Sequence, residues 1–395
     1  MGRWAEHFTV IAPDTPGFGQ SGPLPDEQPE IDAFAAALLE LLDALGIERT
    51  GAYGFHSGGV IAVAAFKQQP QRFSALAVGG YAVWSEAERR LFDTAYLPPF
   101  LPSAYGEHLT WLWNRILEQS WFFPWFDVRP EVRLSVAHDD PARVNAVVRD
   151  MLDSGDAHRA GYGAVLRASR DIPLPDADTP PVLITAYDGD PLQTHIDRLG
   201  PMPKSWSARK VRAPAEQEAE TLAFLQAHPS PLPPALVEAA DEGFVLVQGK
   251  QLHWRGQGPV LRVHAPGRSV ETLEGFALDL PGHGLSDAWS GEPWPTLIEA
   301  ARDALGADCV AVEPAPAGDP ARLFPDLSPD RYGAYLTRAW AIVRARHFFA
   351  PWYEAGAGNA VPFDTAALAP TRLAVEHREL LRATAARDYM LSMGG

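Results

Sequence analysis

The sequence predicts an α/β fold in which a mostly parallel sheet is flanked by helices and carries a helical cap, followed by a partial repeat of the same unit. Three observations predict it. Short β-branched segments alternate with segments of helical spacing over the first 81 residues. Two similar turn-rich loops, DTPGFGQS and DLPGHGLS, stand in the two halves of the chain. An aromatic, helical pattern follows each loop.

The first elements form a regular series. Residues 9–12 (TVIA) are β-branched, predict a buried strand and run directly into the loop at residues 14–21. The next segments are a helix at 31–45, a strand at 51–55, a helix at 60–68 and a strand at 76–81. Gly46 follows the first helix, as is common at helix C-termini. Strands joined through helices predict a parallel sheet covered on both faces.

The pattern changes between residues 85 and 178, where aromatic helical segments dominate and predict a cap. Strand-like residues then resume the sheet at 182–187 and 208–212, and a closing helix is expected at 216–227. The Pro-rich segment HPSPLPP predicts a semi-rigid linker. We therefore expect a first domain at 1–228 and a linker at 229–243.

An internal repeat predicts the second domain, at 244–395. The loop at residues 279–286 aligns with residues 14–21 without a gap, and residues 303–306 are identical to residues 43–46. Further identities recur at equal separations, with Tyr332, Gly333, Leu336, Trp340, Pro351 and Trp352 matching Tyr105, Gly106, Leu109, Trp113, Pro124 and Trp125. Their order indicates a duplication with cap-like helices of its own.

The two copies are incomplete in different places. The second has strand-like segments at 244–248, 252–255 and 260–263 before its loop, and the first begins too late to contain them. The second copy lacks the closing strands. One hypothesis is that its strands complete the first sheet, with residues 260–263 paired beside residues 9–12 and His264 near Ser57.

Charge and composition exclude several classes of function. The net charge of −17 disfavours nucleic acid and anionic membranes as partners. The single cysteine, Cys309, allows neither an intrachain disulfide nor a Cys-rich metal site, as expected in a cytoplasmic protein. No secretory signal pattern and no apolar stretch of about 18 residues is present. The sequence leaves the oligomeric state open.

One motif carries nucleophilic chemistry. Phe55-His56-Ser57-Gly58-Gly59 lies between a predicted strand and a predicted helix, where small neighbours permit a sharp turn. This motif, the upstream Asp-x-Pro-Gly-x-Gly-x-Ser loop and a downstream Asp-Pro resemble those of capped α/β-hydrolases. The family's turn usually reads Gly-x-Ser-x-Gly, and here Phe55 takes the first glycine position while Gly54 lies beside it.

The resemblance implies roles for particular residues. Ser57 would attack, the backbone N–H of Gly58 would stabilise an oxyanion, and Asp190 would orient a catalytic histidine. Asp188 competes with Asp190 for that role. The loop at 14–21 would border the site and serve structure alone. No cofactor and no metal are implied.

The histidine is missing from its expected place, because residues 205–212 read SWSARKVR. His195 is the first substitute, since it lies nearest Asp190 in the sequence. The other candidates in the first copy are His228, His108, His138 and His158. His56 is expected to pack, with its side chain directed away from Ser57.

The second oxyanion donor is also missing, since the first copy begins beyond the loop that would supply it. In the second copy Pro266 has no N–H to donate, and residues 312–318 (VEPAPAG) contain no serine, so we interpret this copy as catalytically inactive. The sequence predicts a serine hydrolase of the carboxylesterase type, acting on an ester-like bond of a small, apolar substrate. The alternative is an impaired protein that binds a small ligand or a partner.

Overall fold

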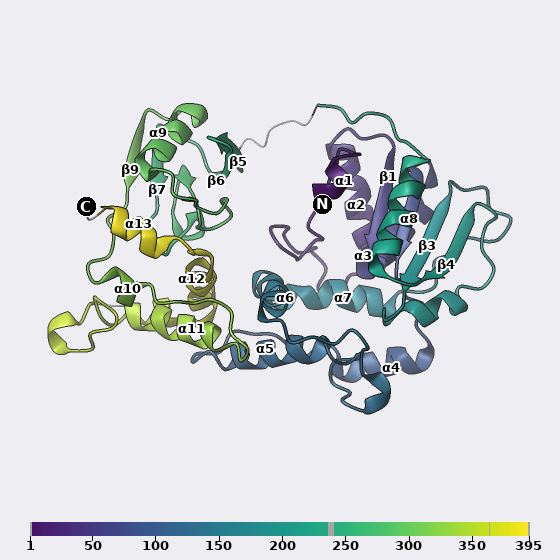
Figure 1. Cartoon of the computed structure of the whole chain (residues 1–395), viewed down its shortest axis with the longest axis horizontal. Coiled ribbons are helices and arrows are strands. Elements are labelled where there is room, and N and C mark those ends of the chain that lie inside the picture. Colours follow the sequence, from purple (N-terminus) through teal and green to yellow (C-terminus); the bar gives the residue numbers. More distant parts are fainter. Residues whose placement is uncertain (1, 236–240, 363, 394–395) are drawn as a thin grey trace. The chain divides into compact units, whose positions relative to one another are not determined.

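The computed structural model describes residues 2–235, 241–362 and 364–393 (Figure 1). The chain divides into two compact units. Unit 1 comprises Met1–Phe100, Arg115–Asp139 and Ala146–Val237, and unit 2 comprises Leu101–Asn114, Asp140–Asn145 and Glu238–Gly395. Residues 236–240 of the predicted linker lie outside the described residues.

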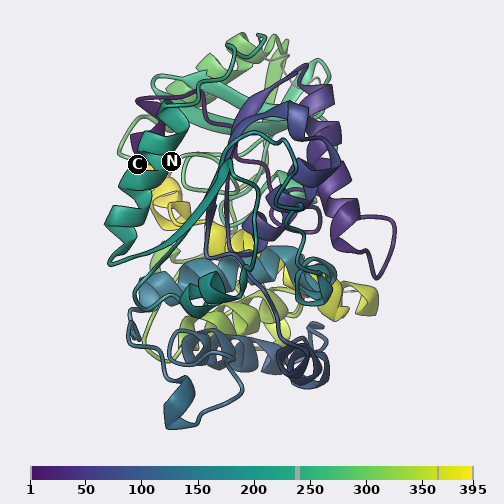
Figure 2. The same ribbon diagram turned by 90° about the vertical axis from the view of Figure 1, so that its right-hand side faces the viewer.

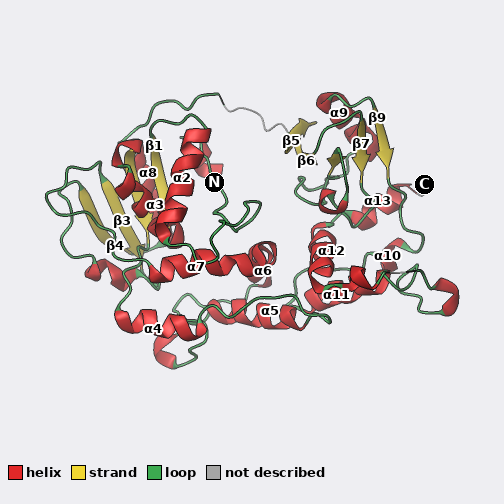
Figure 3. Cartoon of the chain, turned by 180° about the vertical axis from the view of Figure 1, so that it is seen from behind, coloured by secondary structure: helices red, strands yellow, loops and turns green. Residues whose placement is uncertain are grey.

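Unit 1 is built on a four-stranded parallel sheet in the order β1-β2-β3-β4 (Figure 3). Its strands are β1 (Thr50–Phe55), β2 (Phe73–Gly79), β3 (Val182–Tyr187) and β4 (Trp206–Val211). The helices assigned wholly or partly to this unit are α1 (Gly2–Ala5), α2 (Ile31–Ala44), α3 (Ser57–Gln68), α4 (Glu86–Ala95), α5 (Glu107–Gln119), α6 (Pro141–Ser154), α7 (His158–Arg167) and α8 (Pro214–Gln226). The prediction of a parallel sheet flanked by helices is confirmed.

The side chains of β2 alternate between the two faces of the sheet, and this alternation explains why helices cover both faces. Leu76 and Val78 pack in the core cluster that contains α2 and α3, whereas Ala75 and Ala77 face Leu225 of α8. Successive side chains of a strand point to opposite faces, so two apolar sets bind helices on two sides. Figure 2 shows α2, in purple, and α8, in teal, on opposite sides of these strands. The all-apolar sequence of β2 is typical of a strand buried on both faces.

The strand predicted at residues 9–12 does not form, and these residues have no regular secondary structure. Among its described residues, unit 1 has no counterparts of the two strands that flank the equivalent segment in unit 2, and β1 is left at the edge of its sheet. The equivalent β8 (Ala277–Leu278) of unit 2 does form, between β6 (Lys250–Arg255) and β7 (Val260–Val263). The hypothesis of one composite sheet is therefore wrong, because β7 pairs within a separate sheet.

Unit 2 contains a five-stranded mixed sheet in the order β5-β6-β8-β7-β9. Its outer strands are β5 (Glu242–Val247), antiparallel to β6, and β9 (Cys309–Val312), parallel to β7. The helices of this unit are α9 (Trp294–Leu305), α10 (Pro320–Leu323), α11 (Ala334–Arg346), α12 (Pro370–Arg382) and α13 (Ala386–Met393). The three strands predicted before the second loop correspond to β5, β6 and β7.

Positions that the sequence repeat aligns meet in unit 2. The indole N–H of Trp113, on α5, donates to the carbonyl oxygen of Arg331 at 3.3 Å. The indole N–H of Trp340, on α11, donates to the carbonyl oxygen of Ala104, also at 3.3 Å. These reciprocal contacts form a two-fold-like interface, which is the arrangement that identical surfaces favour.

Candidate active site

The turn between β1 and α3 places a different residue at its apex from the one that the sequence motif suggested. His56 has φ 47° and ψ −112°, and α3 begins at Ser57. A Cβ atom on residue 54 would lie 2.4 Å from the carbonyl oxygen of Gly58, so this close approach needs glycine at position 54. The pattern that the backbone follows is thus Gly54-Phe55-His56-Ser57-Gly58, with histidine at the centre.

A positive φ at a residue other than glycine costs roughly 1–3 kcal/mol and is kept where the surroundings enforce it. The backbone N–H of His56 donates to the carbonyl oxygen of Gly79 at 2.8 Å, and its carbonyl oxygen accepts from Val60 at 3.1 Å. The turn is therefore bonded to β2 on one side and to α3 on the other. Ser57, expected at the strained position, is the first residue of the helix instead.

The His56 side chain points to the acid that follows β3. Its Nε2 lies 3.0 Å from Oδ1 and 3.1 Å from Oδ2 of Asp190. The Asp190 carboxylate is fully buried and also accepts the backbone N–H of Leu192 at 2.8 Å, whereas the His56 side chain is 32% exposed. The expectation that His56 only packs is therefore wrong: it is the histidine that contacts the predicted acid. The Asp188 carboxylate instead accepts from the side-chain amide of Gln193.

A glycine at the end of β2 admits this pair. Gly80 has φ +62°, and a Cβ atom there would lie 2.5 Å from Cδ2 of His56 and 2.8 Å from Oδ2 of Asp190. The backbone N–H of Gly80 donates to the carbonyl oxygen of Thr185 at 2.7 Å, which joins β2 to β3. The Phe55 ring stacks on the imidazole, with ring centres 3.9 Å apart. The imidazole is thus held between the Phe55 ring, the Asp190 carboxylate and the backbone of Gly80.

The carboxylate determines which nitrogen of His56 carries the proton. A carboxylate can only accept, so Nε2 carries the hydrogen and Nδ1 keeps its lone pair in the neutral ring. Nδ1 makes no hydrogen bond within the described residues. The site therefore presents an unengaged basic nitrogen at the apex of a strained turn.

Ser57 and Gly58 occupy the first turn of α3, where backbone N–H groups have no partner within the helix. In this fold, the backbone N–H of the residue after the apex is the oxyanion donor. With His56 at the apex, that donor is the N–H of Ser57 and not that of Gly58. The Ser57 hydroxyl makes no hydrogen bond to a histidine within the described part of the chain. The structure does not bring Ser57 and His195 into contact.

His195 has a structural environment. It lies in the 3₁₀ segment Gln193–Arg198, where its Nδ1 accepts the backbone N–H of Val83 at 2.9 Å. Its Nε2 lies 3.3 Å from a guanidinium nitrogen of Arg198. Burial, aided by the charge of Arg198, lowers the pKa of His195 to about 4. Nδ1 accepts from the backbone, so the proton of the neutral ring is on Nε2 and no lone pair remains for a base to use. His195 therefore links its segment to residue 83 and is not placed to serve Ser57.

The other histidines proposed as substitutes contact groups away from His56. Nδ1 of His228 lies 2.8 Å from the carbonyl oxygen of Phe224, and Nδ1 of His158 lies 2.6 Å from that of Gly155. Nδ1 of His108 accepts from the backbone of Ser103, in unit 2. His138 lies in unit 1, and its backbone carbonyl accepts from Ser120 and Trp121.

A groove of about 1520 Å³ runs along the free edge of β1. The groove is lined by residues from 7–16, β1, α2, α8 and 228–234. Gly58, from the turn between β1 and α3, also lines the groove. The lining includes Phe8, Phe34, Leu38, Leu41 and Ile61. Apolar surface of this kind, next to a few polar groups, is typical of sites for small ligands.

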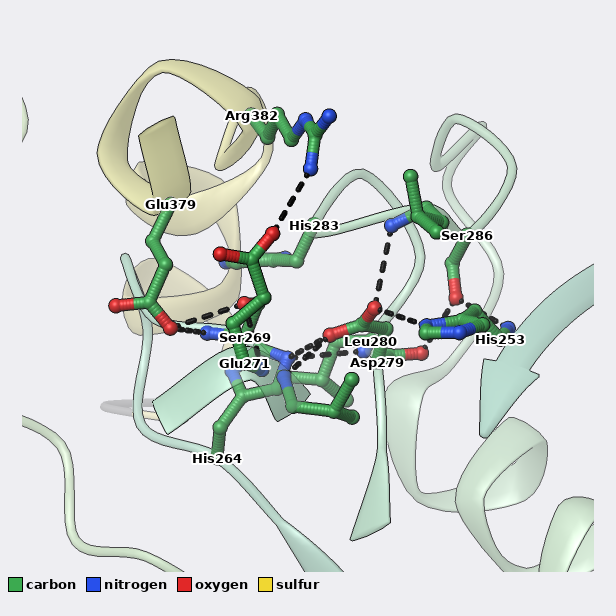
Figure 4. A network of polar contacts seen from close by, with 12 residues as sticks. His253, His264, Ser269, Glu271, Asp279, Leu280, His283, Ser286, Glu379 and Arg382 are labelled. Carbon is green, nitrogen blue, oxygen red and sulfur yellow. Dashed lines mark hydrogen bonds and ion pairs between the residues drawn. The ribbon is translucent and has the colours of Figure 1, made fainter. Parts of the chain in front are cut away.

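The loop at residues 14–21 is held by an internal hydrogen bond, like its counterpart in unit 2. The Ser21 hydroxyl donates to the backbone carbonyl of Asp14 at 2.8 Å, and the Ser286 hydroxyl donates to that of Asp279 at 2.7 Å. Figure 4 shows Asp279 at the centre of a buried network. Its carboxylate accepts from Nδ1 of His253 at 2.7 Å and from the backbone of Val270 at 2.8 Å.

His264 belongs to this second network. Its Nε2 accepts the backbone N–H of Leu280 at 3.1 Å, and its Nδ1 donates to the carbonyl oxygen of Ala265 at 2.9 Å. The position after β9 holds Glu313, whose carboxylate accepts the backbone N–H of Ala265 at 3.1 Å. Unit 2 therefore has a carboxylate where unit 1 has its strained turn.

The described residues have neither a metal-binding cluster nor a membrane-spanning helix. They contain no group of three or more His, Cys, Asp or Glu side chains placed to hold a metal ion. They also contain no helix that is long and apolar enough to cross a membrane.

Comparison with known proteins gives one family model, described as alpha/beta hydrolase fold, which matches residues 4–212. A hydrolase from Pseudomonas aeruginosa is 19% identical, with 54% of this chain and 77% of that chain covered and a TM-score of 0.39. A thermophilic esterase from Thermogutta terrifontis is 17% identical, with 57% of this chain and 81% of the esterase covered and a TM-score of 0.40. The 2-hydroxy-6-oxo-6-phenylhexa-2,4-dienoate hydrolase of Rhodococcus is 20% identical, covering 58% and 82%, with a TM-score of 0.38.

Proposed function

The chain belongs to the α/β-hydrolase fold family, and on that basis we propose that it hydrolyses an ester-like bond of a small, apolar substrate, with His56 and Asp190 as its reactive pair. One observation carries the proposal. The strained apex residue is a histidine whose Nε2 is bound by a buried carboxylate and whose Nδ1 is unengaged. The turn that presents a nucleophile in this fold here presents a base.

The proposed reaction uses water as the nucleophile. Nδ1 of His56 takes a proton from water while the water oxygen attacks the substrate carbonyl carbon. Asp190 stabilises the imidazolium that forms, because its carboxylate is bound to the other ring nitrogen. The imidazolium then returns the proton to the leaving oxygen, so that an acid and an alcohol are released and His56 is regenerated.

The N-terminus of α3 supports the charged intermediate. The backbone N–H groups of Ser57 and Gly58 belong to its first turn, which carries partial positive charge. An oxyanion beside that turn would be stabilised by these donors. The apolar groove at β1 supports a small, apolar substrate, since Gly58 lines it beside Phe34 and Ile61.

An acyl-enzyme on Ser57 is the other route to the same products, and variants separate the two. Purified protein is assayed with short p-nitrophenyl esters. We expect His56→Ala to lower kcat/KM by about 10²-fold or more, the usual contribution of a general base. Ser57→Ala keeps its backbone N–H and is expected to retain most activity. His347→Gln, in unit 2, is the matched histidine control.

A fluorophosphonate probe gives an independent answer. The water mechanism predicts that Ser57 stays unlabelled while ester hydrolysis proceeds. Labelling that is lost in Ser57→Ala, together with loss of hydrolysis in that variant, would instead establish the acyl-enzyme.

A binding function is the second candidate, favoured by the absence of histidine in residues 205–212, which include β4. It predicts no turnover by the wild-type protein and saturable binding of an apolar ligand in the groove. Wild-type turnover that is lost in His56→Ala would overturn it. We further propose a cytoplasmic location, which the single cysteine supports. We also propose a small molecule as the partner, which the groove supports.

A further inference from the structure

Phe55, the last residue of β1, is a large apolar residue whose position the hydrophobic core does not explain. It is 39% exposed. It belongs to neither of the two apolar clusters that lie on the two faces of the sheet in unit 1. An aromatic side chain that is only partly removed from water gains less from burial than one in the core. The contact that fixes the Phe55 ring therefore lies outside the core.

That contact is with the imidazole of His56, against which the Phe55 ring lies nearly flat. The ring centres are 3.9 Å apart and the ring planes differ by 17°. Aromatic pairs in proteins usually have centres about 4.5–7 Å apart, so these two rings are closely stacked. In unit 2 the rings of Phe244 and His253 are 5.4 Å apart, and their planes are tilted by 47°. A flat stack on a histidine is thus a particular feature of the turn after β1.

Two successive glycines at the end of β2 make room for these two successive rings. Gly79 pairs with Phe55 in the sheet, and a Cβ atom at position 79 would lie 2.5 Å from Cδ2 of Phe55. A Cβ atom at position 80 would lie 2.5 Å from Cδ2 of His56. Any other residue at either position would displace one of the rings, because only glycine has no Cβ. The stack therefore depends on β2 as well as on β1.

The stack restricts the orientation of His56. The hydrogen bond from Nε2 to Oδ1 of Asp190, at 3.0 Å, does not by itself fix the plane of the ring. The Phe55 ring covers one face of the imidazole and fixes that plane. Without it, a side chain that is one third exposed could rotate into water. A fixed plane keeps Nε2 on the carboxylate and so favours a single tautomer, with Nδ1 free to act as a base.

The stack also favours the charged form of the imidazole. The face of a benzene ring carries partial negative charge and attracts a cation that lies over it. In the reaction proposed for this site, His56 becomes an imidazolium as it takes a proton from water. Phe55 then interacts more strongly with His56 in the transition state than before the reaction, so its contribution falls on kcat. Phe55 is not among the described residues that line the groove, so substrate affinity should not depend on it.

We propose that Phe55 is a positioning residue, whose ring holds the His56 imidazole with Nε2 on Asp190 and stabilises the imidazolium during hydrolysis. The family's turn motif leaves the residue before the apex free, so the motif itself does not require phenylalanine there. The stabilisation of the imidazolium rests on the proposed function. The orientation of the imidazole does not, because it follows from the stack alone.

Steady-state kinetics with short p-nitrophenyl esters test the effect on hydrolysis. Phe55→Leu keeps an apolar side chain without a π face, and we expect kcat to fall about three- to fivefold with KM unchanged, the effect of one cation–π contact at a partly exposed site. Phe55→Tyr keeps the π face and should retain kcat. Phe244→Leu is the matched control, because the Phe244 ring is not stacked on its histidine. An equal fall of kcat in Phe55→Leu and Phe55→Tyr, or a change confined to KM, would overturn this effect.

Nitrogen NMR of protein with isotope-labelled histidine rings tests the orientation without relying on activity. The signal that is lost in His56→Gln identifies His56. In mildly alkaline solution, where imidazole is neutral, we expect the hydrogen on Nε2 alone in the wild type and in Phe55→Tyr, and a mixture of both tautomers in Phe55→Leu. A single tautomer in Phe55→Leu, or a mixture in the wild type, would overturn the positioning role. If the wild-type protein hydrolyses no ester, the proposed function fails and the tautomers alone decide the role of Phe55.

Discussion

The two units each contain a histidine bound to an aspartate, and the two pairs differ in what surrounds them. In unit 1 His56 is one third exposed and keeps one ring nitrogen unengaged. In unit 2 His253 is buried and uses both nitrogens, binding Asp279 at 2.7 Å and Glu242 at 3.0 Å. A fully engaged pair stabilises the fold, whereas a pair with an accessible lone pair can react. The same residue types therefore predict different roles in the two units.

Replacing the two aspartates should separate stability from chemistry. Asp279→Asn leaves His253 buried beside fewer charges, and we expect it to destabilise unit 2 by about 3–5 kcal/mol. Asp190→Asn should lower ester hydrolysis far more than stability, because His56 reaches solvent. Urea unfolding gives the stability, and hydrogen exchange followed by mass spectrometry assigns the loss to a unit. Equal effects of the two variants on stability would remove the distinction.

Gly80→Ala tests the geometry of the reactive pair. An added Cβ would lie against His56 and Asp190, so we expect hydrolysis to fall by about tenfold or more, since small displacements of reacting groups have large effects on rate. Gly155→Ala is the matched control, because Gly155 also has a positive φ and no atom lies within 4 Å of the added Cβ. Both variants carry the cost of the backbone conformation. A similar loss of hydrolysis in both would show that backbone strain, and not contact with the pair, is responsible.

The sequence predicted the framework of unit 1 but assigned its central turn to the wrong residue. The alternation of strand-like and helix-like segments was sufficient to predict β1 to β4, because each segment has a clear hydrophobic periodicity. The motif was aligned on Ser57, since serine is the family's usual nucleophile. The two glycines at positions 54 and 58 were the signal for His56, because they flank it symmetrically. Asp190 was predicted, and its partner was not.

The strand at residues 9–12 could not be settled from local sequence. The same type of segment forms β8 in unit 2, where β6 and β7 lie on either side. In unit 1 no such neighbours exist within the described residues. Strand formation requires a partner for the backbone N–H and C=O groups, and that partner is distant in the sequence.

The stability of unit 2 should depend on pH through its buried histidine–aspartate pair. Burial alone would lower the pKa of His253, but its bonds to Asp279 and Glu242 outweigh burial and raise it above 6.5. The stabilisation by His253 is then complete below pH 6.5 and is lost as the pH rises through the raised value. Burial would raise the pKa of Asp279, yet its hydrogen bonds lower it below 3.8, so that its stabilisation is lost as the pH falls through the lowered value.

Unit 2 should therefore be most stable between these limits, in mildly acidic solution. Hydrogen exchange of β6 and β8, measured across this range, would show a maximum of protection that His253→Gln flattens on its alkaline side. An unchanged profile in that variant would assign the dependence to other groups.

The smallest expected effect compares the two matching loops. Ser286→Ala removes the bond to the Asp279 carbonyl and a second one, in which the backbone N–H of His253 donates to the Ser286 hydroxyl at 2.9 Å. At about 1 kcal/mol for each partly buried bond, we expect a loss near 2 kcal/mol. Ser21→Ala removes one exposed bond, to the Asp14 carbonyl, and should cost less than about 0.5 kcal/mol because water replaces it. Urea unfolding of both variants measures the difference, and equal losses would mean that the two loops contribute alike despite their different burial.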